Sequence, residues 1–576
     1  MNRDRLFWPV LGLIVVSAGY LEVRSAMGET QTWDEGIHIS AGYAYLTLGD
    51  YSWNPEHPPL IKILSAVPLL FLGLQVHPYD AAGKPQDQVH FGIDFLYHNR
   101  RDADTILLAA RAVPIALSLA FIAAIGWWVR RRWGTAAGLL AAALAGFDPN
   151  LIAHGRYVTT DVPEAACFFF ACVLWVEYLE RAGTRRLLLA AALFAVAMVV
   201  KFSAVLLLPP MVLLFAFAWI RRPRDFGVRR AATAAAALAG VLLVTVVVVY
   251  WPETVRCWKA RGAPAVPIPA GEATPLTTAM RVLHLPRHTF LTGLNDVVFH
   301  NESGHESYLM GIRSDKGLWD YFPVVFAVKS TLTALTAFAL LLAAVASASW
   351  PTFGSNRNPP SRQRLSAPPG WHDRLRAMPL MAAGLALPPA IYFAFSMSSA
   401  INLGMRHILP IYPFLYAGIA ALLAQVPWRR TAQVAMLLLA AGQIAECAWI
   451  APDYLAFFNA ASGGPGRGPE YLLDSNIDWG QDVKKLVHWL DAHGTRRARI
   501  YYFGNAQMSY YGVQEVGWPD PLDQKGWDEI DDYCVVNVTP LYGVYAPLNA
   551  LAPLRLREPV AKIGWSMYVY DLRKKK

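Results

Sequence analysis

The stretch LFWPVLGLIVVSAGYLE, residues 6–22, leads into TWDEG, residues 32–36. The apolar part is about as long as a helix must be to cross a bilayer. Asp34 and Glu35 come soon after the point where such a helix leaves the hydrocarbon, so we expect both carboxylates at the membrane surface, within reach of a lipid headgroup. The competing interpretation is that these acids only begin an interfacial helix, because carboxylates stabilise a helix N-terminus.

The composition indicates a polytopic membrane protein. The chain has 576 residues, 55% of them hydrophobic and 20 of them Trp, and its mean hydropathy of +0.30 is high for a large soluble enzyme. The net charge of +9 would also suit a nucleic-acid partner, but the arginines fall in short clusters between apolar segments, as topology signals do. Ser25-Ala26-Met27 is a poor signal-peptide cleavage site, so the first segment is taken as a membrane helix.

Further apolar segments give about eleven membrane spans in all. They lie near residues 105–127, 134–147, 162–180, 186–200, 203–220, 231–251, 320–349, 378–397, 407–425 and 431–450. The arginine clusters between them alternate as the positive-inside rule requires. This pattern assigns the following to the outer side: residues 30–104, 148–161, 252–318, 398–406 and everything after about 451. The loop 351–377, rich in Pro, Ser and Arg, is assigned to the cytoplasm and predicted to be mobile.

Two runs in the first outer loop, residues 38–48 and 59–74, are too short or too interrupted to span the membrane. We expect them to form amphipathic helices that lie in the membrane interface. The loop as a whole would then present its ionisable residues at the outer membrane surface.

The chain becomes polar after residue 450, with a helix-like run at 479–493 and strand-like runs at 500–503, 533–538 and 567–570. This change predicts a small α/β domain outside the membrane. We therefore divide the chain into a membrane module, residues 1–450, and an extracytoplasmic domain, residues 451–576.

The second outer loop carries HGRYVTTD, residues 154–161, which includes Arg156 and ends at the start of a predicted span. Asp161 could simply cap that helix, as acids often do. Its recurrence on the same side as Asp34 favours a shared acidic site instead.

The long loop 252–318 contains HNESGHE, residues 300–306, followed by Arg313. His and Glu side chains could bind a divalent ion. However, no helical His spacing and no Cys partner supports a metal site, and the five cysteines of the chain are scattered. We expect no metal here, and His305, Glu306 and Arg313 are predicted to contact a polar substrate, with plain solvation of the loop as the alternative.

The segment GMRHILP, residues 404–410, places Arg406 and His407 at the outer end of a predicted span. A fixed guanidinium at headgroup depth suits a phosphate, because it can hold two phosphate oxygens at once. The alternative is an interfacial arginine that reaches ordinary lipid headgroups. Lys201, in a short outer turn, is a further cation on this side.

Acids beside a phosphate site favour one kind of reaction. If a sugar is linked through phosphate to a lipid, breaking its C1–O bond needs a carboxylate to activate the acceptor hydroxyl and cations to stabilise the departing phosphate. No nucleotide-binding loop is needed, and the sequence contains neither a P-loop nor a dinucleotide-binding glycine motif. No cofactor is expected.

The first-loop motifs, Thr32 to Glu35, Gly49-Asp50-Tyr51 and Glu56-His57-Pro58-Pro59-Leu60, resemble those of GT-C membrane glycosyltransferases, in particular the aminoarabinose transferases of lipid A and the protein O-mannosyltransferases. Three weaker islands are similar to motifs of bacterial members: residues 156–161, 404–410 and 474–482. The resemblance touches most of the chain, but only in islands.

The resemblance implies a polyprenyl-phosphate sugar donor, an inverting transfer, and catalysis by Asp34 with Glu35 beside it. Asp161 would correspond to the second-loop acid, and Glu56, His57 and Arg156 would contact substrate. Aminoarabinose transferases usually carry Lys where this chain has His57. Because His is only partly charged at neutral pH, phosphate binding would rest on Arg406 with His407 and Lys201, and the donor sugar cannot be carried over.

The sequence thus predicts a polytopic α-helical GT-C glycosyltransferase with a small α/β extracytoplasmic domain, in a bacterial inner membrane, whose active site faces the periplasm or exterior. Its expected partners are a polyprenyl-phosphate sugar, membrane lipids and a protein, lipid or glycan acceptor, and no nucleic acid. The competing class is a transporter or flippase of lipid-linked sugars. Buried charges at mid-membrane would favour that class, whereas the acids and bases of the outer-loop motifs gather at the outer ends of spans.

Overall fold

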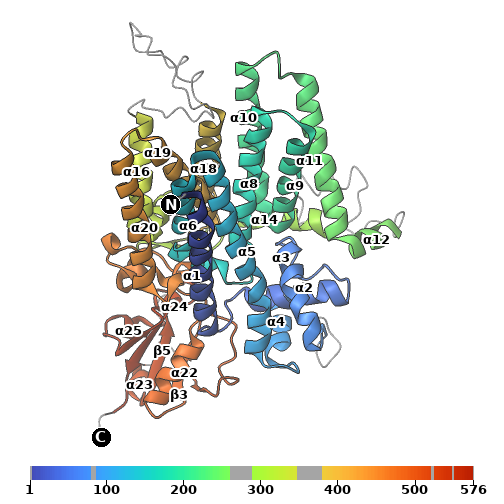
Figure 1. The fold of residues 1–576 in the computed structure, drawn as a ribbon. Coiled ribbons are helices and arrows are strands. Elements are labelled where there is room, and N and C mark those ends of the chain that lie inside the picture. Colours follow the sequence, from blue (N-terminus) through green and yellow to red (C-terminus); the bar gives the residue numbers. More distant parts are fainter. Residues whose placement is uncertain are drawn as a thin grey trace.

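The computed structural model describes residues 3–79, 86–259, 288–346, 379–519, 524–547 and 550–574. The predicted mobile loop 351–377 and the middle of the outer loop 252–318 lie outside these residues. Long helices run side by side in a bundle (Figure 1). They are α1 (Phe7–Met27), α5 (Ala103–Trp133), α6 (Thr135–Gly146), α8 (Asp161–Glu180), α9 (Thr184–Val200), α10 (Leu208–Arg221), α11 (Val228–Val249), α16 (Leu332–Ala346), α18 (Leu380–Met397), α19 (Tyr412–Gln425) and α20 (Arg429–Ile450).

Shorter elements connect the long helices. The α-helices among them are α2 (Glu35–Thr47), α3 (Leu60–Ala66), α4 (Gln88–Tyr97), α7 (Pro149–Gly155), α12 (Trp251–Lys259), α14 (Thr289–Ser303) and α15 (Tyr321–Lys329). The 3-10 helices are η1 (Arg3–Leu6), η2 (Val67–Leu72), η3 (Phe202–Leu207), η5 (Met405–Ile411), η6 (Tyr454–Ala456), η7 (Ala460–Ser462), η8 (Pro465–Arg467) and η9 (Asp474–Asn476). A small antiparallel hairpin is formed by β1 (Ser307–Leu309) and β2 (Ile312–Ser314).

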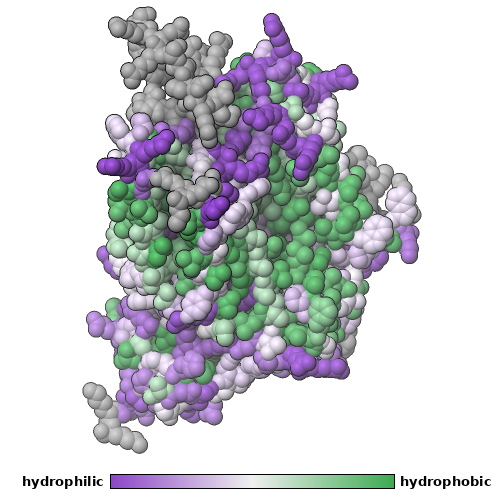
Figure 2. Space-filling model, in the orientation of Figure 1, coloured by the Kyte–Doolittle hydropathy of each residue, from purple (hydrophilic) through white to green (hydrophobic). Residues whose placement is uncertain are grey.

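The polytopic architecture is confirmed. Within the described residues eight helices are long and apolar enough to cross a membrane, or up to ten if each of two bent pairs is one span. One predicted span, near residues 186–200, is not among these helices. It forms α9, which has only 17 residues. Figure 2 shows a mostly hydrophobic belt along the bundle between two hydrophilic ends, as burial of the belt in lipid requires.

The two runs of the first outer loop form helices, as predicted, but α2 does not lie in the membrane interface. Every residue from Glu35 to Tyr45 is buried. The reason is that α3 and α4 pack against α2, so closely that a Cβ on Gly42 would come within 2.1 Å of the Lys62 carbonyl oxygen. The first run is therefore covered by protein, whereas the second run leaves Leu70 and Phe71 of η2 exposed, as an interfacial helix would.

The C-terminal region contains the predicted sheet. Its strands are β3 (Arg497–Tyr501), β4 (Gln514–Val516), β5 (Tyr533–Asn537), β6 (Ala561–Ile563) and β7 (Met567–Asp571). The strand order is β4-β3-β5-β7-β6, with β3 parallel to β4 and β5, and β7 antiparallel to β5 and β6. The helices of this region are α21 (Gly468–Tyr471), α22 (Val483–Ala492), α23 (Gln524–Asp528), α24 (Val538–Leu541) and α25 (Ala552–Arg555).

Side chains alternate across this sheet, as the pleat dictates. Val535 belongs to the same apolar cluster as Val483 and Leu486 of α22, whereas Cys534 and Val536 belong to the large core that continues into the helix bundle. The sheet and the α2–α4 segment lie at the same end of the bundle in Figure 1. Both are therefore positioned to contribute to one site at that end.

Candidate active site

Asp34 and Arg406 meet although the sequence separates them by 372 positions. Asp34 immediately precedes α2, and Arg406 lies in η5, which leads into α19. Arg406 Nη1 donates to Asp34 Oδ2 over 3.0 Å. The Asp34 and Arg406 side chains keep 21% and 12% of their surface exposed, so a substrate can reach both members of the pair.

Trp479 supports both members of this pair. The Arg406 guanidinium carbon lies 4.5 Å from the centre of the Trp479 ring, a cation–π contact. The backbone N–H of Trp33 donates to the Trp479 carbonyl oxygen over 2.9 Å. Arg406 Nε is buried without a hydrogen-bond partner among the described residues. The guanidinium is thus held over a buried ring with one donor still unused.

Asp161 lies at the start of α8 and forms an ion pair with Lys201, which directly follows α9. Lys201 Nζ lies 2.8 Å from Asp161 Oδ1 and 3.2 Å from Glu164 Oε2. Asp161 Oδ2 is buried and has no hydrogen-bond partner among the described residues. Because two carboxylates already surround Lys201, its charge is largely neutralised before any phosphate binds.

Glu35 points away from the Asp34 pair into a closed cluster. Its carboxylate accepts two hydrogen bonds from Arg111, over 2.8 and 2.6 Å, and further ones from the backbone N–H groups of Thr32 and Val158. Neither Glu35 nor Arg111 is exposed. These contacts tie the first loop to α5 and to the second outer loop. The catalytic role predicted for Glu35 stays a prediction.

Arg156 is also enclosed. Its guanidinium donates to both carboxylate oxygens of Glu29, over distances of 2.8 to 3.2 Å, and Nη2 lies 2.9 Å from the Tyr157 hydroxyl. Arg156 and Glu29 are essentially unexposed. Contact of Arg156 with a substrate stays a prediction, and in this structure its donors are taken by the protein.

His57 stands edge-on to His38, with the ring centres 5.2 Å apart. Desolvation by the surrounding protein, and then the charges of His38 and Lys62, lower the pKa of His57 well below its ordinary value. His57 is therefore neutral at neutral pH and offers a substrate a hydrogen bond rather than a charge. Its neighbour Glu56 is partly exposed beside it.

Lys62 is a residue that the sequence-based predictions missed. It is fully buried and donates to the Asn54 carbonyl oxygen, to Asn54 Oδ1 and to the Tyr45 hydroxyl, over 2.7, 2.9 and 3.0 Å. These contacts close the loop that carries Glu56 and His57. The sequence does carry a signal for Lys62, because it stands in the otherwise apolar run LIKIL, residues 60–64. An unpaired buried ammonium group is costly, so a lysine in such a run is expected to have polar partners.

His305, Glu306 and Arg313 meet the C-terminal region at Tyr545. The Tyr545 hydroxyl donates to Asp474 Oδ2 over 2.7 Å and lies 3.2 Å from His305 Nδ1. The backbone N–H of Tyr545 donates to Glu306 Oε2 over 3.0 Å, and Arg313 Nη1 lies 3.8 Å from Glu306 Oε1. Within the described parts of the chain, no group of three or more His, Cys, Asp or Glu side chains could hold a metal ion.

The segment from Asp474 to Asp482 braces the site. Asn476 Oδ1 accepts from the backbone N–H of Met405 over 3.0 Å, next to Arg406. Lys329 donates to the Asn476 carbonyl oxygen over 2.6 Å, and the Gln481 carbonyl oxygen accepts from Thr30 N–H over 2.9 Å. By sequence alone this segment could contact an acceptor or be a structural loop. Its contacts show that it joins η5 to the first outer loop.

His407 is partly exposed next to Arg406, and its ring stacks at 6.4 Å from that of Phe322 in α15. The structure thus gathers Asp34, Arg406, His407, Asp161, Lys201 and His57 at one end of the bundle, with mutual electrostatic influence among the charged members. Glu35 and Arg156 lie in closed ion pairs behind them, and His305, Glu306 and Arg313 meet Tyr545 beside this group, with His305 within electrostatic reach of His407.

Comparison with known proteins gives one family match. Residues 104–251 match the family described as dolichyl-phosphate-mannose-protein mannosyltransferase. Solved structures of ArnT from Cupriavidus metallidurans are similar over 98% of this chain. The form bound to undecaprenyl phosphate has 14% identity, 99% of its chain covered and a TM-score of 0.47. The apo form has 13% identity, 98% of its chain covered and a TM-score of 0.46.

No curated protein matches the chain. The matched residues 104–251 run from α5 to just past the end of α11, so they include the second outer loop with Asp161 and the turn with Lys201. They do not include Asp34 or Arg406. Over these residues the chain is similar to that family, which is one of the two families that the motifs of its sequence resemble.

Proposed function

We propose that this protein transfers a sugar from a polyprenyl-phosphate donor to an acceptor hydroxyl at the outer face of the membrane, with inversion at the sugar C1 atom. The observation that carries the proposal is the Asp34–Arg406 pair. It is a partly exposed carboxylate 3.0 Å from a partly exposed guanidinium, at one end of a bundle of membrane-length helices. A base and a phosphate ligand side by side are what this reaction requires.

Asp34 acts as the general base. It takes the proton of the acceptor hydroxyl while the acceptor oxygen attacks C1 on the side opposite the phosphate. The new C1–O bond forms as the bond to the phosphate oxygen breaks, and the electron pair of that bond stays on the lipid phosphate. A single displacement of this kind inverts the configuration at C1. Asp34 is left protonated and the lipid phosphate carries the additional negative charge.

Arg406 stabilises that charge. A guanidinium has five N–H donors in one plane and can hold phosphate through two parallel bonds. Nη1 donates to Asp34, and the unpartnered Nε supplies a further donor without breaking the pair. The contact with Trp479 fixes the guanidinium, so the donors are oriented before substrate binds. His407 next to it adds a ring N–H donor.

Asp161 and Lys201 position the donor rather than carry out the chemistry. Lys201 holds Asp161 at 2.8 Å, and Oδ2 of Asp161 can accept a sugar hydroxyl. Glu56 and His57 contact the donor from the first loop, where the neutral His57 replaces the lysine of the aminoarabinose enzymes. Glu35 and Arg156 hold the two outer loops in place through their buried ion pairs.

The cluster of His305, Glu306, Arg313 and Tyr545 lies on the acceptor side of the site. It joins the outer loop 252–318 to the C-terminal region and presents polar groups outside the helix bundle. Polar hydroxyl and imidazole groups of this kind recognise hydroxyl-rich acceptors by hydrogen bonds. Protein, lipid and glycan acceptors all offer such hydroxyls.

Transfer of radiolabelled sugar from polyprenyl phosphate in membranes tests the proposal. Wild type, Asp34→Asn and, as a matched control in the same loop, Asp94→Asn are compared, since the Asp94 carboxylate contacts His98 and Gln86 in and beside α4, away from the Asp34 pair. Label should reach an acceptor with wild type and the control but not with Asp34→Asn. Near-normal transfer by Asp34→Asn overturns the base assignment, and donor binding without turnover in all three favours a translocator.

A further inference from the structure

A cavity of about 600 Å³ opens at the other end of the bundle, between the connection from α8 to α9 and the connection from α10 to α11. Tyr178 and Asp161 lie near opposite ends of α8, which places the cavity about 25 Å from the acidic site by the helical rise per residue. This is the end that the arginine clusters assign to the cytoplasm. The cavity therefore has no part in the reaction proposed above.

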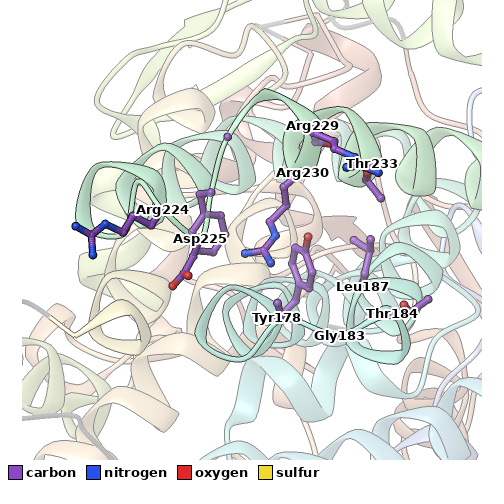
Figure 3. A pocket seen from close by; sticks show the side chains of 12 residues that line it. Tyr178, Gly183, Thr184, Leu187, Arg224, Asp225, Arg229, Arg230 and Thr233 are labelled. Carbon is purple, nitrogen blue, oxygen red and sulfur yellow. The ribbon is translucent and has the colours of Figure 1, made fainter.

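Positive charge dominates the lining of this cavity. Arg224, Arg229 and Arg230 contribute guanidinium groups, and Asp225 is the acid among the lining residues. Figure 3 shows Arg230 and Tyr178 side by side in the middle of the pocket, while Arg224 extends away from them. The Arg230 guanidinium lies over the Phe226 ring, 4.8 Å from its centre, which leaves its edge available for other contacts.

The side chains of these three arginines form no ion pair or hydrogen bond within the described part of the chain, not even with Asp225. Arg222 is different, because it donates to the carbonyl oxygens of Leu179 and Glu180 and so joins the two connections. The structural contacts at this position are made by Arg222. The hydrogen-bond donors of its three neighbours are therefore available to a ligand.

Backbone groups add to the positive electrostatic potential of the cavity. Both α9 and α11 begin at the cavity, after Gly183 and Gly227, and neither helix has a side-chain cap. The first N–H groups of such helices have no intrahelical partner, and the helix dipole is positive at this end. The hydroxyl of Thr184 also lines the cavity. These groups reinforce the arginines in attracting an anion.

The apolar flank beside the cavity indicates where the anion comes from. In α11 only Ala234 is buried among the described residues, and Ile220 of α10 and Val228 of α11 are strongly exposed next to the arginines. Figure 2 shows hydrophilic side chains at this end above the hydrophobic belt. A phosphate bound in the cavity would thus have room for acyl chains along the lipid-facing side of α11.

We propose that this cavity binds the headgroup phosphate of an anionic phospholipid from the adjacent leaflet, with Arg229 and Arg230 as the phosphate ligands. Guanidinium groups recognise phosphate oxygens in pairs. Basic pockets between helices at the cytoplasmic side are suited to anionic lipid headgroups by position and charge. The site is separate from the proposed donor site and selects a structural lipid rather than a substrate.

Native mass spectrometry of the full-length protein in detergent tests this site. Phosphatidylglycerol and phosphatidylcholine with identical acyl chains are titrated into wild type, the Arg229→Gln/Arg230→Gln double variant and each single variant. Arg429→Gln is the matched control, because Arg429 is an exposed arginine at the start of α20 on the same end of the bundle. Thermal unfolding of every variant accompanies the titration.

We expect the double variant to lose at least about tenfold in phosphatidylglycerol affinity, the order of one charge-assisted hydrogen bond, while the control is unchanged. Phosphatidylcholine should bind all proteins equally weakly. The site is overturned if the double variant, or both single variants should the double one unfold, retains wild-type affinity. Equal binding of phosphatidylcholine also overturns it. If millimolar inorganic phosphate displaces the lipid, the assignment of a lipid ligand is overturned and the cavity is a site for free phosphate.

Discussion

The Glu35 carboxylate and the Arg111 guanidinium form a fully buried, two-point ion pair, with Oε2 2.6 Å from Nη2. Asp34, the preceding residue, has a partly exposed carboxylate that meets Arg406 instead. Two adjacent acids thus have opposite environments. The buried one fixes the loop against α5, and the accessible one is open to a substrate.

Replacing Glu35 by Gln should lower the stability of the protein. Removal of one partner leaves the Arg111 charge buried without compensation, and breaking such a pair costs about 3–5 kcal/mol. Thermal unfolding in detergent measures the loss. The double variant Glu35→Gln/Arg111→Met should recover part of it, since neither charge then remains unpaired. Additive losses in the double variant would show that the two residues act independently.

Arg406→Ala should reduce sugar transfer by about two to three orders of magnitude, because a preorganised donor to a developing charge contributes on that scale. Arg406→Lys should recover only part of the activity, since an ammonium group can neither hold two phosphate oxygens in one plane nor stack in the same way on Trp479. Steady-state transfer rates at saturating donor make the comparison. Full activity of Arg406→Lys would limit the role of Arg406 to that of a simple positive charge.

Much of the fold could be predicted from local signals. Apolar runs of membrane length indicated the long helices, and the strand-like runs at residues 533–538 and 567–570 indicated β5 and β7. The three-residue strands β4 and β6 are too short for a periodic signal and become strands only because β3 and β7 offer them paired edges. The burial of α2 was equally hidden, since it depends on α3 and α4 packing around it.

The individual residues of the site could be predicted from the sequence, but which of them pair with one another could not. Asp34 and Arg406 are each recognisable as ionisable groups beside a span, yet nothing local indicates that they meet across 372 positions. Arg111 carries a signal that could have helped. It falls within the predicted span 105–127, and a charge inside a span requires a partner, which could have indicated that one of the two adjacent acids is buried with it.

Stability should fall as the pH is lowered below about 6.5, the ordinary pKa of His. The pKa values of His38 and His57 are lowered in the folded protein, first by burial. The unfolded chain therefore binds protons that the folded chain does not, so their contribution is present above the unfolded pKa and is lost as the pH falls toward the folded one. Melting temperatures from pH 8 to pH 5 measure this loss. His57→Gln should reduce the slope, and His77→Gln, at an exposed position outside the site, is the control.

Tyr545→Phe should raise the KM for acceptor about tenfold, with little change in donor binding. The substitution removes only the hydroxyl that donates to Asp474 and approaches His305, so it disturbs the acceptor-side cluster by about one or two hydrogen bonds. The Phe503 ring still stacks on residue 545, 5.2 Å away, which keeps the segment in place. Tyr510→Phe, also at an exposed tyrosine of the C-terminal region, is the control. An equal rise in the KM for donor would place this cluster on the donor side of the site, and no change in either constant would leave Tyr545 a purely structural contact between the outer loop and the sheet domain.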